Sequence, residues 1–231
     1  TTGGRLAVFT PTTVKVGGKV ALSDDTSLSI GTALGAGTPL TATSMSVGNN
    51  VELKLTGITA TKPFDQVLID TTTGIVGDFI NASVESPVDY LTMATKKSTD
   101  GKQYLAAYGL TWMAASDLAH GTFTLVNDSD SFTVDTALTD QAPATNWDGK
   151  TLTKRGNGTL VLAGKNDYTG GTRIDSGVLS VSDDTNLGAT AGGLILNGGT
   201  LATTASFETA RAVTLEKASG IDVSEPTELG L

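Results

Sequence analysis

The sequence predicts an all-β protein assembled from many short strands. Its 231 residues include 28 Gly, and aromatic residues make up only 5% of the chain. Thr is abundant; its β-branched side chain suits pleated strands, and Gly suits the bends between them. No long segment has a 3.6-residue apolar period, whereas short alternating segments recur at 122–125, 131–134 and 159–162. These features favour strands punctuated by turns over helices.

A nine-residue pattern occurs twice in the chain. Val20–Leu28 reads VALSDDTSL, and Leu179–Leu187 reads LSVSDDTNL. Each copy follows a Gly-containing turn and consists of an alternating strand, a Ser-Asp-Asp-Thr turn and a Leu. Repetition of one unit is what a solenoid requires, because a single coil cannot bury its own inner face. We therefore expect the same supersecondary unit at both positions.

A longer motif spans residues 152–179 and resembles the autotransporter-associated β-strand repeat. The one minor departure is Asp167, where the family often has Thr, and Leu187-Gly188 is similar to the family's continuation. A looser resemblance joins 66–79 and 89–91 to the segment that precedes such repeats in autotransporter passengers. The motif positions that this chain keeps are Gly156, Gly158, Asn166, Tyr168, Gly170, Thr172, Ile174, Gly177 and Leu179.

The resemblance implies a right-handed parallel β-helix, a solenoid, within the exported passenger of a bacterial autotransporter (type V secretion). It implies a place at the bacterial cell surface, either anchored to the outer membrane or secreted. The implied role is adhesion or self-association, as in aggregation and biofilm, together with a β-helical stalk that supports export and folding. The implied partners are a host surface or matrix component, or other passengers. The start Thr1-Thr2-Gly3-Gly4 leads us to expect a fragment of a longer protein. The two resemblances together imply that it comes from the membrane-proximal half of a passenger, ahead of a C-terminal outer-membrane β-barrel that this fragment lacks.

Three segments are expected along this solenoid. Residues 1–60 and 147–231 are predicted to form β-helix rungs, the latter with the repeat. Residues 61–146 are richer in aromatics and are predicted to form an irregular β region of the same solenoid. Within it, Asp100-Gly101 separates two β-prone runs, which is a strong hairpin signal. We expect this hairpin to protrude from the rungs or to lean against them.

The repeat residues have physical roles that agree with a solenoid. Gly156 and Gly158 permit a tight corner between two faces. Asn166 is expected to bond the backbone of its neighbours at a turn or to stack in an Asn ladder. Tyr168 is expected to cover the edge of a corner. The residues expected to stack inward on neighbouring rungs are Leu160, Leu162, Ile174 and Leu179.

Charge and composition exclude several classes of binding partner and of chemistry. The net charge of −9 argues against nucleic-acid binding, which needs clustered Lys and Arg, and against docking on anionic lipid. Because the chain has no Cys, it can form no disulfide, thiol nucleophile or thiolate metal site. The absence of Cys also suits a chain exported through an oxidising compartment.

Few residues could carry catalysis. A Ser-His-Asp hydrolase would have to use the single histidine, His120, yet no serine motif accompanies it. The acidic pairs Asp24-Asp25 and Asp183-Asp184 more often cap turns than face each other across a cleft. Asp128 and Asp130 could at most hold calcium weakly. We therefore predict a protein that is not an enzyme, with no catalytic, cofactor-binding or metal-binding residue. The alternative is a polysaccharide-active or esterase-type β-helical enzyme that uses Asp128, Asp130 or His120.

Overall fold

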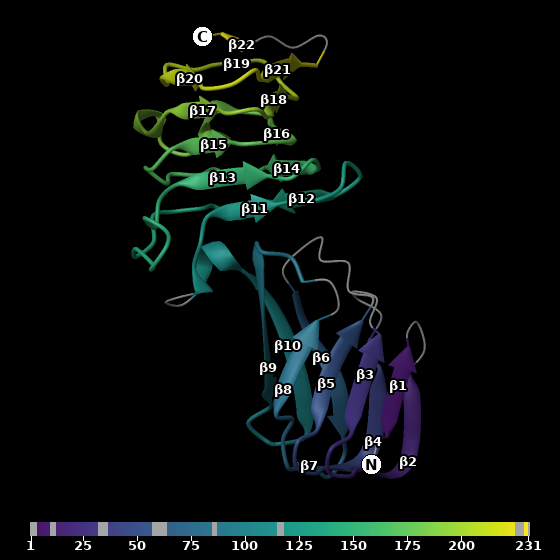
Figure 1. Ribbon diagram of the computed structural model, residues 1–231. Helices are drawn as coiled ribbons and strands as arrows, with labels where there is room; N and C mark the ends of the chain where they lie inside the picture. The colour runs from purple at the N-terminus through teal and green to yellow at the C-terminus, as the bar shows by residue number, and fades with distance from the viewer. Residues whose placement is uncertain are drawn as a thin grey trace. The chain divides into compact units, whose positions relative to one another are not determined.

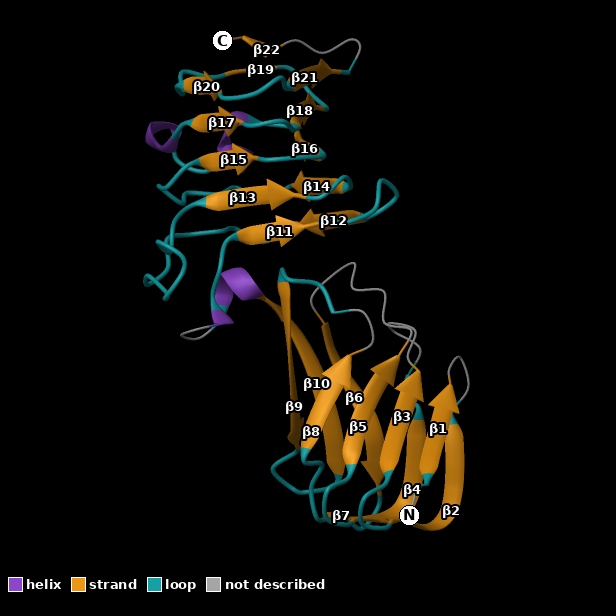
Figure 2. Ribbon diagram, viewed as in Figure 1, coloured by secondary structure: helices purple, strands orange, loops and turns teal. Residues whose placement is uncertain are grey.

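Strands dominate the protein, as Figures 1 and 2 show. Among the described residues, the secondary structure outside the strands consists of turns and of 3-10 helices such as η1 (Thr111–Met113), η3 (Asp184–Leu187) and η4 (Thr190–Gly192). The described part of the chain contains no helix long and apolar enough to span a membrane. The prediction of an all-β fold is confirmed. The computed structural model describes residues 4–9, 13–31, 37–56, 64–84, 87–114, 118–224 and 229–230.

The chain forms two compact units. The first contains Thr1–Pro87 and Met93–Gly109, and the second contains Val88–Thr92 and Leu110–Leu231. The segment 61–146 therefore contributes to both units. The expected boundary at residue 60 and the start Thr1-Thr2-Gly3 lie outside the described residues.

Two sheets build the first unit, and the chain alternates between them from β1 to β6. The first sheet has four strands, and consecutive members pair in parallel. They are β1 (Arg5–Phe9), β3 (Ser27–Gly31), β5 (Glu52–Thr56) and β8 (Asn81–Val84). The second has six strands in the order β2 (Val14–Leu22), β4 (Leu40–Val47), β6 (Phe64–Thr71), β10 (Gln103–Leu110) and β9 (Leu91–Lys97), with β7 (Ile75–Val76) also pairing with β4. Over β1 to β6, one strand from each sheet makes one coil, whereas β9 and β10 both belong to the second sheet.

The core of the first unit consists of apolar rows that run across the coils. Leu28 lies in register between Leu6 and Leu53, and both Leu28 and Leu53 are fully buried. The alternation of β-strand side chains places every second residue inside, so the register aligns equivalent residues of successive coils. Leu40 and Ile69 form a similar buried pair in the second sheet.

The predicted hairpin is present as β9 and β10. Gly101 has a φ of +68° in its turn, and the Asp100 carboxylate accepts hydrogen bonds from the Ser98 hydroxyl at 2.5 Å and the Lys102 amide at 3.0 Å. The expectation that the hairpin protrudes is wrong, because β10 pairs with β6 as an antiparallel strand. This pairing satisfies backbone groups that β6 would otherwise expose at a sheet edge.

The second unit repeats one coil five times. Its first sheet contains β11 (Thr122–Thr124), β13 (Leu152–Arg155), β15 (Thr172–Ile174), β17 (Leu194–Leu196) and β20 (Val213–Leu215). Its second contains β12 (Ser131–Val134), β14 (Thr159–Leu162), β16 (Val178–Val181), β18 (Thr200–Thr203) and β21 (Gly220–Val223). A short third face pairs β19 (Phe207–Glu208) with β22 (Leu229–Gly230). All of these pairings are parallel.

Inward stacking of the repeat residues is confirmed. Phe132, Leu160, Leu179 and Leu201 form one continuous row in register, and all four are buried. The four residues predicted to face inward, Leu160, Leu162, Ile174 and Leu179, are each at most 1% exposed. Tyr90 packs on Phe132 and Phe123, with ring centroids 4.5 and 5.9 Å apart, and so adds aromatic contacts to the first coil.

The duplicated nine-residue pattern gives the same strand but a different turn. Val20 and Leu179 are both buried, as are the closing residues Leu28 and Leu187. After β2 the chain turns through Asp25 at a φ of +57° directly into β3, whereas after β16 it enters the 3-10 helix η3. The expectation of one identical unit is therefore wrong at the turn, because different partners on the next coil hold the two turns.

We predict that Leu160→Asp lowers the free energy of unfolding by several kcal/mol, because it buries an unpaired carboxylate between Phe132 and Leu179. The matched control is Val161→Asp on the same strand, whose half-buried side chain faces outward. Urea unfolding of both variants checks this. Equal stability of the two variants would contradict the inward assignment of Leu160.

Candidate functional site

The repeat region builds a buried polar network at the corners of the coils. Strand pairing satisfies the backbone within each sheet, but carbonyl oxygens at the corners need other donors. Side chains from three successive coils supply them. We call this set the corner network: Lys154, Asn166, Tyr168, Thr172, Asp184, Asn186 and Arg211.

Two glycines make the first corner possible, as predicted. Gly156 has a φ of +71°, and a Cβ atom there would lie 2.1 Å from the carbonyl oxygen of Leu125. A Cβ atom on Gly158 would lie 2.5 Å from the carbonyl oxygen of Asp130. Neither position has room for a side chain, so the coils can approach closely only with glycine here.

Lys154 is a fully buried cation on the inner face of β13. Its Cα lies in register between Phe123 and Ile174. The ammonium group donates to the carbonyl oxygens of Arg155, Gly156 and Ser176 at 2.7, 2.8 and 3.2 Å. Burial lowers the pKa of Lys154 to about 8. Lys154 thus ties its own corner to the next coil through backbone acceptors.

Two buried asparagines connect three successive coils, those that contain β12, β14 and β16. Asn166 accepts a hydrogen bond from the Leu138 amide at 2.8 Å and donates to the carbonyl oxygen of Asn186 at 2.5 Å. Asn186 donates to the Gly164 carbonyl at 3.0 Å and accepts from the Ser182 and Asp183 amides, both at 2.9 Å. The prediction that Asn166 bonds the backbone of its neighbours is confirmed.

Tyr168 lies inside the coil rather than over its edge. It is fully buried, its ring lies 5.2 Å from that of Trp112, and its hydroxyl lies 2.6 Å from the Thr172 hydroxyl. Burial raises the pKa of Tyr168. The expectation that Tyr168 covers a corner edge is wrong, because the neighbouring Thr172 hydroxyl gives its phenol a buried hydrogen-bond partner.

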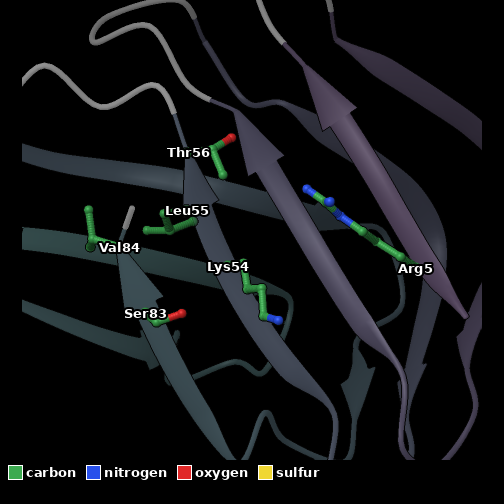
Figure 3. A pocket seen from close by; sticks show the side chains of 6 residues that line it. All are labelled: Arg5, Lys54, Leu55, Thr56, Ser83 and Val84. Atoms are coloured by element: carbon green, nitrogen blue, oxygen red, sulfur yellow. The ribbon is translucent and has the colours of Figure 1, made fainter. Parts of the chain in front are cut away.

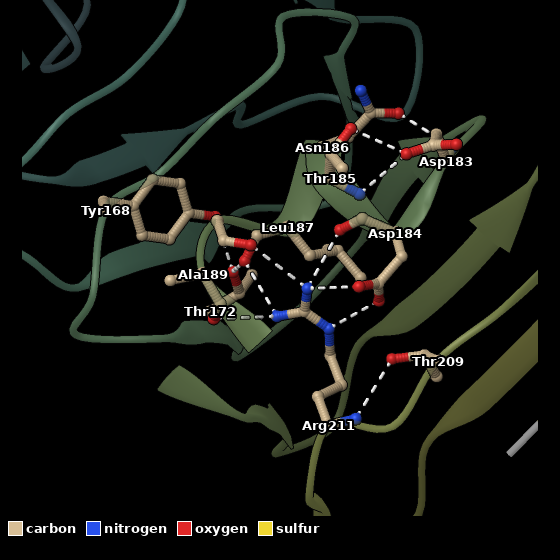
Figure 4. A network of polar contacts seen from close by, with 11 residues as sticks. Tyr168, Thr172, Asp183, Asp184, Thr185, Asn186, Leu187, Ala189, Thr209 and Arg211 are labelled. Atoms are coloured by element: carbon tan, nitrogen blue, oxygen red, sulfur yellow. Dashed lines mark hydrogen bonds and ion pairs between the residues drawn. The ribbon is translucent and has the colours of Figure 1, made fainter. Parts of the chain in front are cut away.

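Arg211 forms the densest part of the network, which Figure 4 shows. Its guanidinium pairs with the Asp184 carboxylate through two bonds of 2.8 and 3.0 Å, and its side chain is fully buried. It also donates to the carbonyl oxygens of Leu187 and Gly188 at 3.1 and 3.2 Å. Burial by itself would raise the pKa of Asp184, but the hydrogen bonds, that from Arg211 foremost, lower it overall.

Sequence reasoning missed Arg211 and the role of Asp184. The two residues are 27 positions apart, and the only signal was an arginine between two alanines just before an alternating strand. Sequence reasoning also missed a series of ion pairs on the outer face of the sheet that contains β13, β15 and β20. There Asp175 accepts from Arg155 and Arg173 at 3.1 and 2.7 Å, and Arg173 also bonds Glu216 at 2.7 Å.

The acidic residues considered for catalysis are held in turns. Asp24 accepts from the Asn49 amide at 2.7 Å, and its hydrogen bonds to Asn49 lower its pKa. Asp183 accepts from the Thr185 amide at 2.9 Å and thereby caps η3. Asp25 accepts from the side-chain amide of Asn50 at 3.1 Å.

The remaining residues considered for catalysis are His120, Asp128 and Asp130. His120 accepts from the Thr122 amide at 3.2 Å at the start of β11. Asp130 accepts from the Asn127 amide at 2.8 Å, and Asp128 is exposed. Within the described ranges, no group of three or more His, Cys, Asp or Glu side chains could hold a metal ion.

A shallow groove of about 300 Å³ lies on the first unit and is shown in Figure 3. Its two cations already have partners. Arg5 donates to the Ser29 hydroxyl at 2.8 Å, and Lys54 pairs with Glu52 at 3.1 Å. Thr56 and Ser83 complete its polar lining. These groups can bind polar ligands, but they supply neither a nucleophile with its base nor a pair of facing carboxylates.

Comparison with known proteins supports the resemblance to autotransporter passengers. The family described as passenger-associated-transport-repeat matches residues 152–181, the stretch that holds the first part of the corner network. A protein named adhesin BmaC autotransporter, from Brucella suis biovar 1 (strain 1330), is 42% identical over 111 residues. That match covers 48% of this chain and 3% of the relative. The chain is therefore similar to autotransporter passengers over these stretches. This class of protein is displayed at the bacterial cell surface, anchored to the outer membrane or secreted.

Stability should depend on pH through Lys154. The folded-state pKa is lowered to about 8 from an ordinary value of 10.5, so between these values the unfolded chain binds more protons than the folded chain. The free energy of unfolding, measured relative to the Lys154→Met variant, should therefore rise from pH 8 to pH 10.5, by at most about 3 kcal/mol.

Urea unfolding at several pH values measures this difference. The difference in free energy of unfolding between the wild type and Lys154→Met should be constant between pH 6 and pH 7, since Lys154 is protonated there in both the folded and the unfolded chain. The exposed Lys165→Met variant is the control and should show no such rise. A Lys154→Met difference that does not change with pH would contradict the lowered pKa.

Proposed function

We propose that this chain is a segment of a surface-displayed passenger folded as a right-handed parallel β-helix. In this proposal the coils of both units belong to one solenoid, with rungs in 1–60 and 147–231 and the less regular segment 61–146 between them. Its role is adhesion or self-association, together with that of a stalk that supports export and folding. The observation that carries the proposal is the unbroken in-register row from Phe132 through Leu160 and Leu179 to Leu201.

The corner network supports the stalk role. In the corner network, a coil presents to its neighbour a row of apolar side chains and several corner carbonyls that need donors. The next coil then supplies the donors, as Arg211 does for the turn at 184–189. Such a scaffold grows coil by coil and needs no bound ion or nucleotide.

The adhesive role rests on the relative and on the kind of surface that a solenoid presents. The relative is named an adhesin. A stack of coils presents long faces, and such extended surfaces are how repeat proteins bind partners. The partner would be a host surface or matrix component, or another passenger. A non-enzymatic role agrees with the carboxylates of Asp24 and Asp183, which are engaged by turn amides.

Surface display tests the proposal. The full passenger is displayed on a non-adherent bacterium, either intact or with residues 1–231 deleted. We expect the deletion to abolish clumping or host-cell binding if the segment carries the adhesive surface. We expect it to abolish export if the segment is needed for folding.

A control passenger replaces residues 1–231 with a similar length of coils from elsewhere in the same passenger, which keeps the length of the stalk. If this swap restores export but not binding, the adhesive surface lies in this segment. If deletion changes neither export, clumping nor binding, the proposed function is wrong.

A further inference from the structure

A second hollow lies on the outer side of the first unit, where the chain enters β3, β5 and β8. Its volume is about 400 Å³, and it shares Lys54 with the groove shown in Figure 3. Its lining includes Ser27, Glu52 and Asn81, which lie in register on the three strands. We call this hollow the polar groove. Its volume is within the usual range of ligand sites, about 300–1,000 Å³.

The side chains that line the polar groove point away from the interior of the unit. Leu28 and Leu53, which follow Ser27 and Glu52 along β3 and β5, are fully buried. Since neighbouring residues of a strand face opposite sides, Ser27 and Glu52 face outward. A further strand beside this sheet would pair with its edge and lengthen the outward row without covering it. The polar groove is therefore a side face of the sheet.

Local contacts hold the charged and amide groups of the polar groove in place. The Asn50 side chain donates to the Asp25 carboxylate at 3.1 Å, and the φ angles of these two residues are +55° and +57°. Lys54 pairs with Glu52 at 3.1 Å while their side chains remain 47% and 43% exposed. A carboxylate has about four acceptor positions, so both acids can accept further hydrogen bonds. A ligand would meet groups that have already lost much of their side-chain freedom.

Three further residues of the lining present polar and apolar surface to a ligand. Within the described ranges, the side chains of Ser27 and Asn81 make no hydrogen bond. A hydroxyl and a side-chain amide can each both donate and accept. Ile80 is 61% exposed and adds apolar surface. The polar groove thus combines donors, acceptors and an apolar side chain in one hollow.

Charge excludes several classes of ligand for the polar groove. Among the described residues that line it, Lys54 is the one cation, and Glu52 already pairs with it. An anionic polymer would need clustered Lys and Arg instead. A metal ion would need several ligands close together, and the described part of the chain has no group of three or more His, Cys, Asp or Glu side chains that could hold one. These observations favour an uncharged ligand that is rich in hydrogen-bonding groups.

We propose that the polar groove binds a neutral oligosaccharide. Sugar hydroxyls donate and accept hydrogen bonds, which matches the Ser27 hydroxyl and the Asn81 amide, and the C–H face of a pyranose ring suits the exposed Ile80. The outward row repeats at the spacing of neighbouring strands, about 4.8 Å, which is close to the advance per ring of an extended sugar chain. This inference rests on the proposed function and names the chemistry of the partner in adhesion.

The test places the purified chain, coupled to fluorescent beads, on an array of neutral oligosaccharides with heparin as the anionic comparison. Coupling to beads lets weak single contacts add up. Asn81→Ala and Glu52→Ala each remove hydrogen-bonding groups from the polar groove. The matched control is Asn157→Ala, which changes an exposed asparagine of the second unit. Asn81 is exposed as well, so neither asparagine variant should change thermal unfolding appreciably.

We expect the wild type and Asn157→Ala to bind at least one neutral oligosaccharide of the array, and this binding should not change with added salt. Titration of the uncoupled chain with that free oligosaccharide should show an affinity about fivefold lower for Asn81→Ala and for Glu52→Ala, as for the loss of one hydrogen bond. The proposal is overturned if no neutral oligosaccharide binds or if Asn157→Ala loses binding as Asn81→Ala does. It is also overturned if heparin binds more strongly than any neutral oligosaccharide and salt weakens that binding.

This test is separable from that of the proposed function. If deletion of residues 1–231 abolishes host-cell binding but the array shows no neutral ligand, only the oligosaccharide assignment is wrong. If the purified variants behave as expected but deletion changes nothing on the cell, the proposed function is wrong and the ligand of the polar groove stands.

Discussion

The structure depends on satisfying the backbone where the chain turns from one sheet to the next. Within the sheets every coil pairs with its neighbours, but the corners lack strand partners. The second unit meets this requirement with buried side chains, chiefly Lys154, Asn166, Asn186 and Arg211. An unmet carbonyl inside a coil would cost free energy comparable to a lost hydrogen bond. The apolar rows can therefore stack closely only because these donors are in place.

This constraint connects the fold to the proposed role. Because each of these donors reaches a neighbouring coil, the coils that carry them help to complete one another's corners. The stack is thereby cooperative over short distances without a large core, which suits a chain with few aromatic residues. The inner rows and the corner donors stabilise the coils, and the outer faces contribute ion pairs such as that of Arg173 with Glu216. A scaffold of this kind can vary its outer face while it keeps its inner rows and corners.

The sequence predicts the parts of this arrangement that local rules determine. Alternation gives the inward positions of Leu160 and Leu179, and Gly156 marks a corner that no side chain could enter. The sequence does not predict contacts that depend on which residues the stacking of coils brings together. The Arg211–Asp184 pair joins positions 27 apart, and Tyr168 is buried only because Thr172 gives its hydroxyl a partner. The hairpin at 91–110 was predictable from Asp100-Gly101. Its pairing with β6 was not, because that pairing depends on contacts between residues far apart in the sequence.

The most direct measurement is the stability of Arg211→Met against that of Arg155→Met. Arg211 is fully buried and bonds Asp184 with several carbonyls, whereas the Arg155 side chain is 57% exposed beside Asp175. We expect Arg211→Met to lower the free energy of urea unfolding by about 3–5 kcal/mol, the usual cost of an orphaned buried charge. Arg155→Met should cost less than about 1 kcal/mol. Adding Asp184→Asn to Arg211→Met should recover part of the loss. Equal, small effects of the two arginine variants would contradict the claim that buried corner donors hold the coils together.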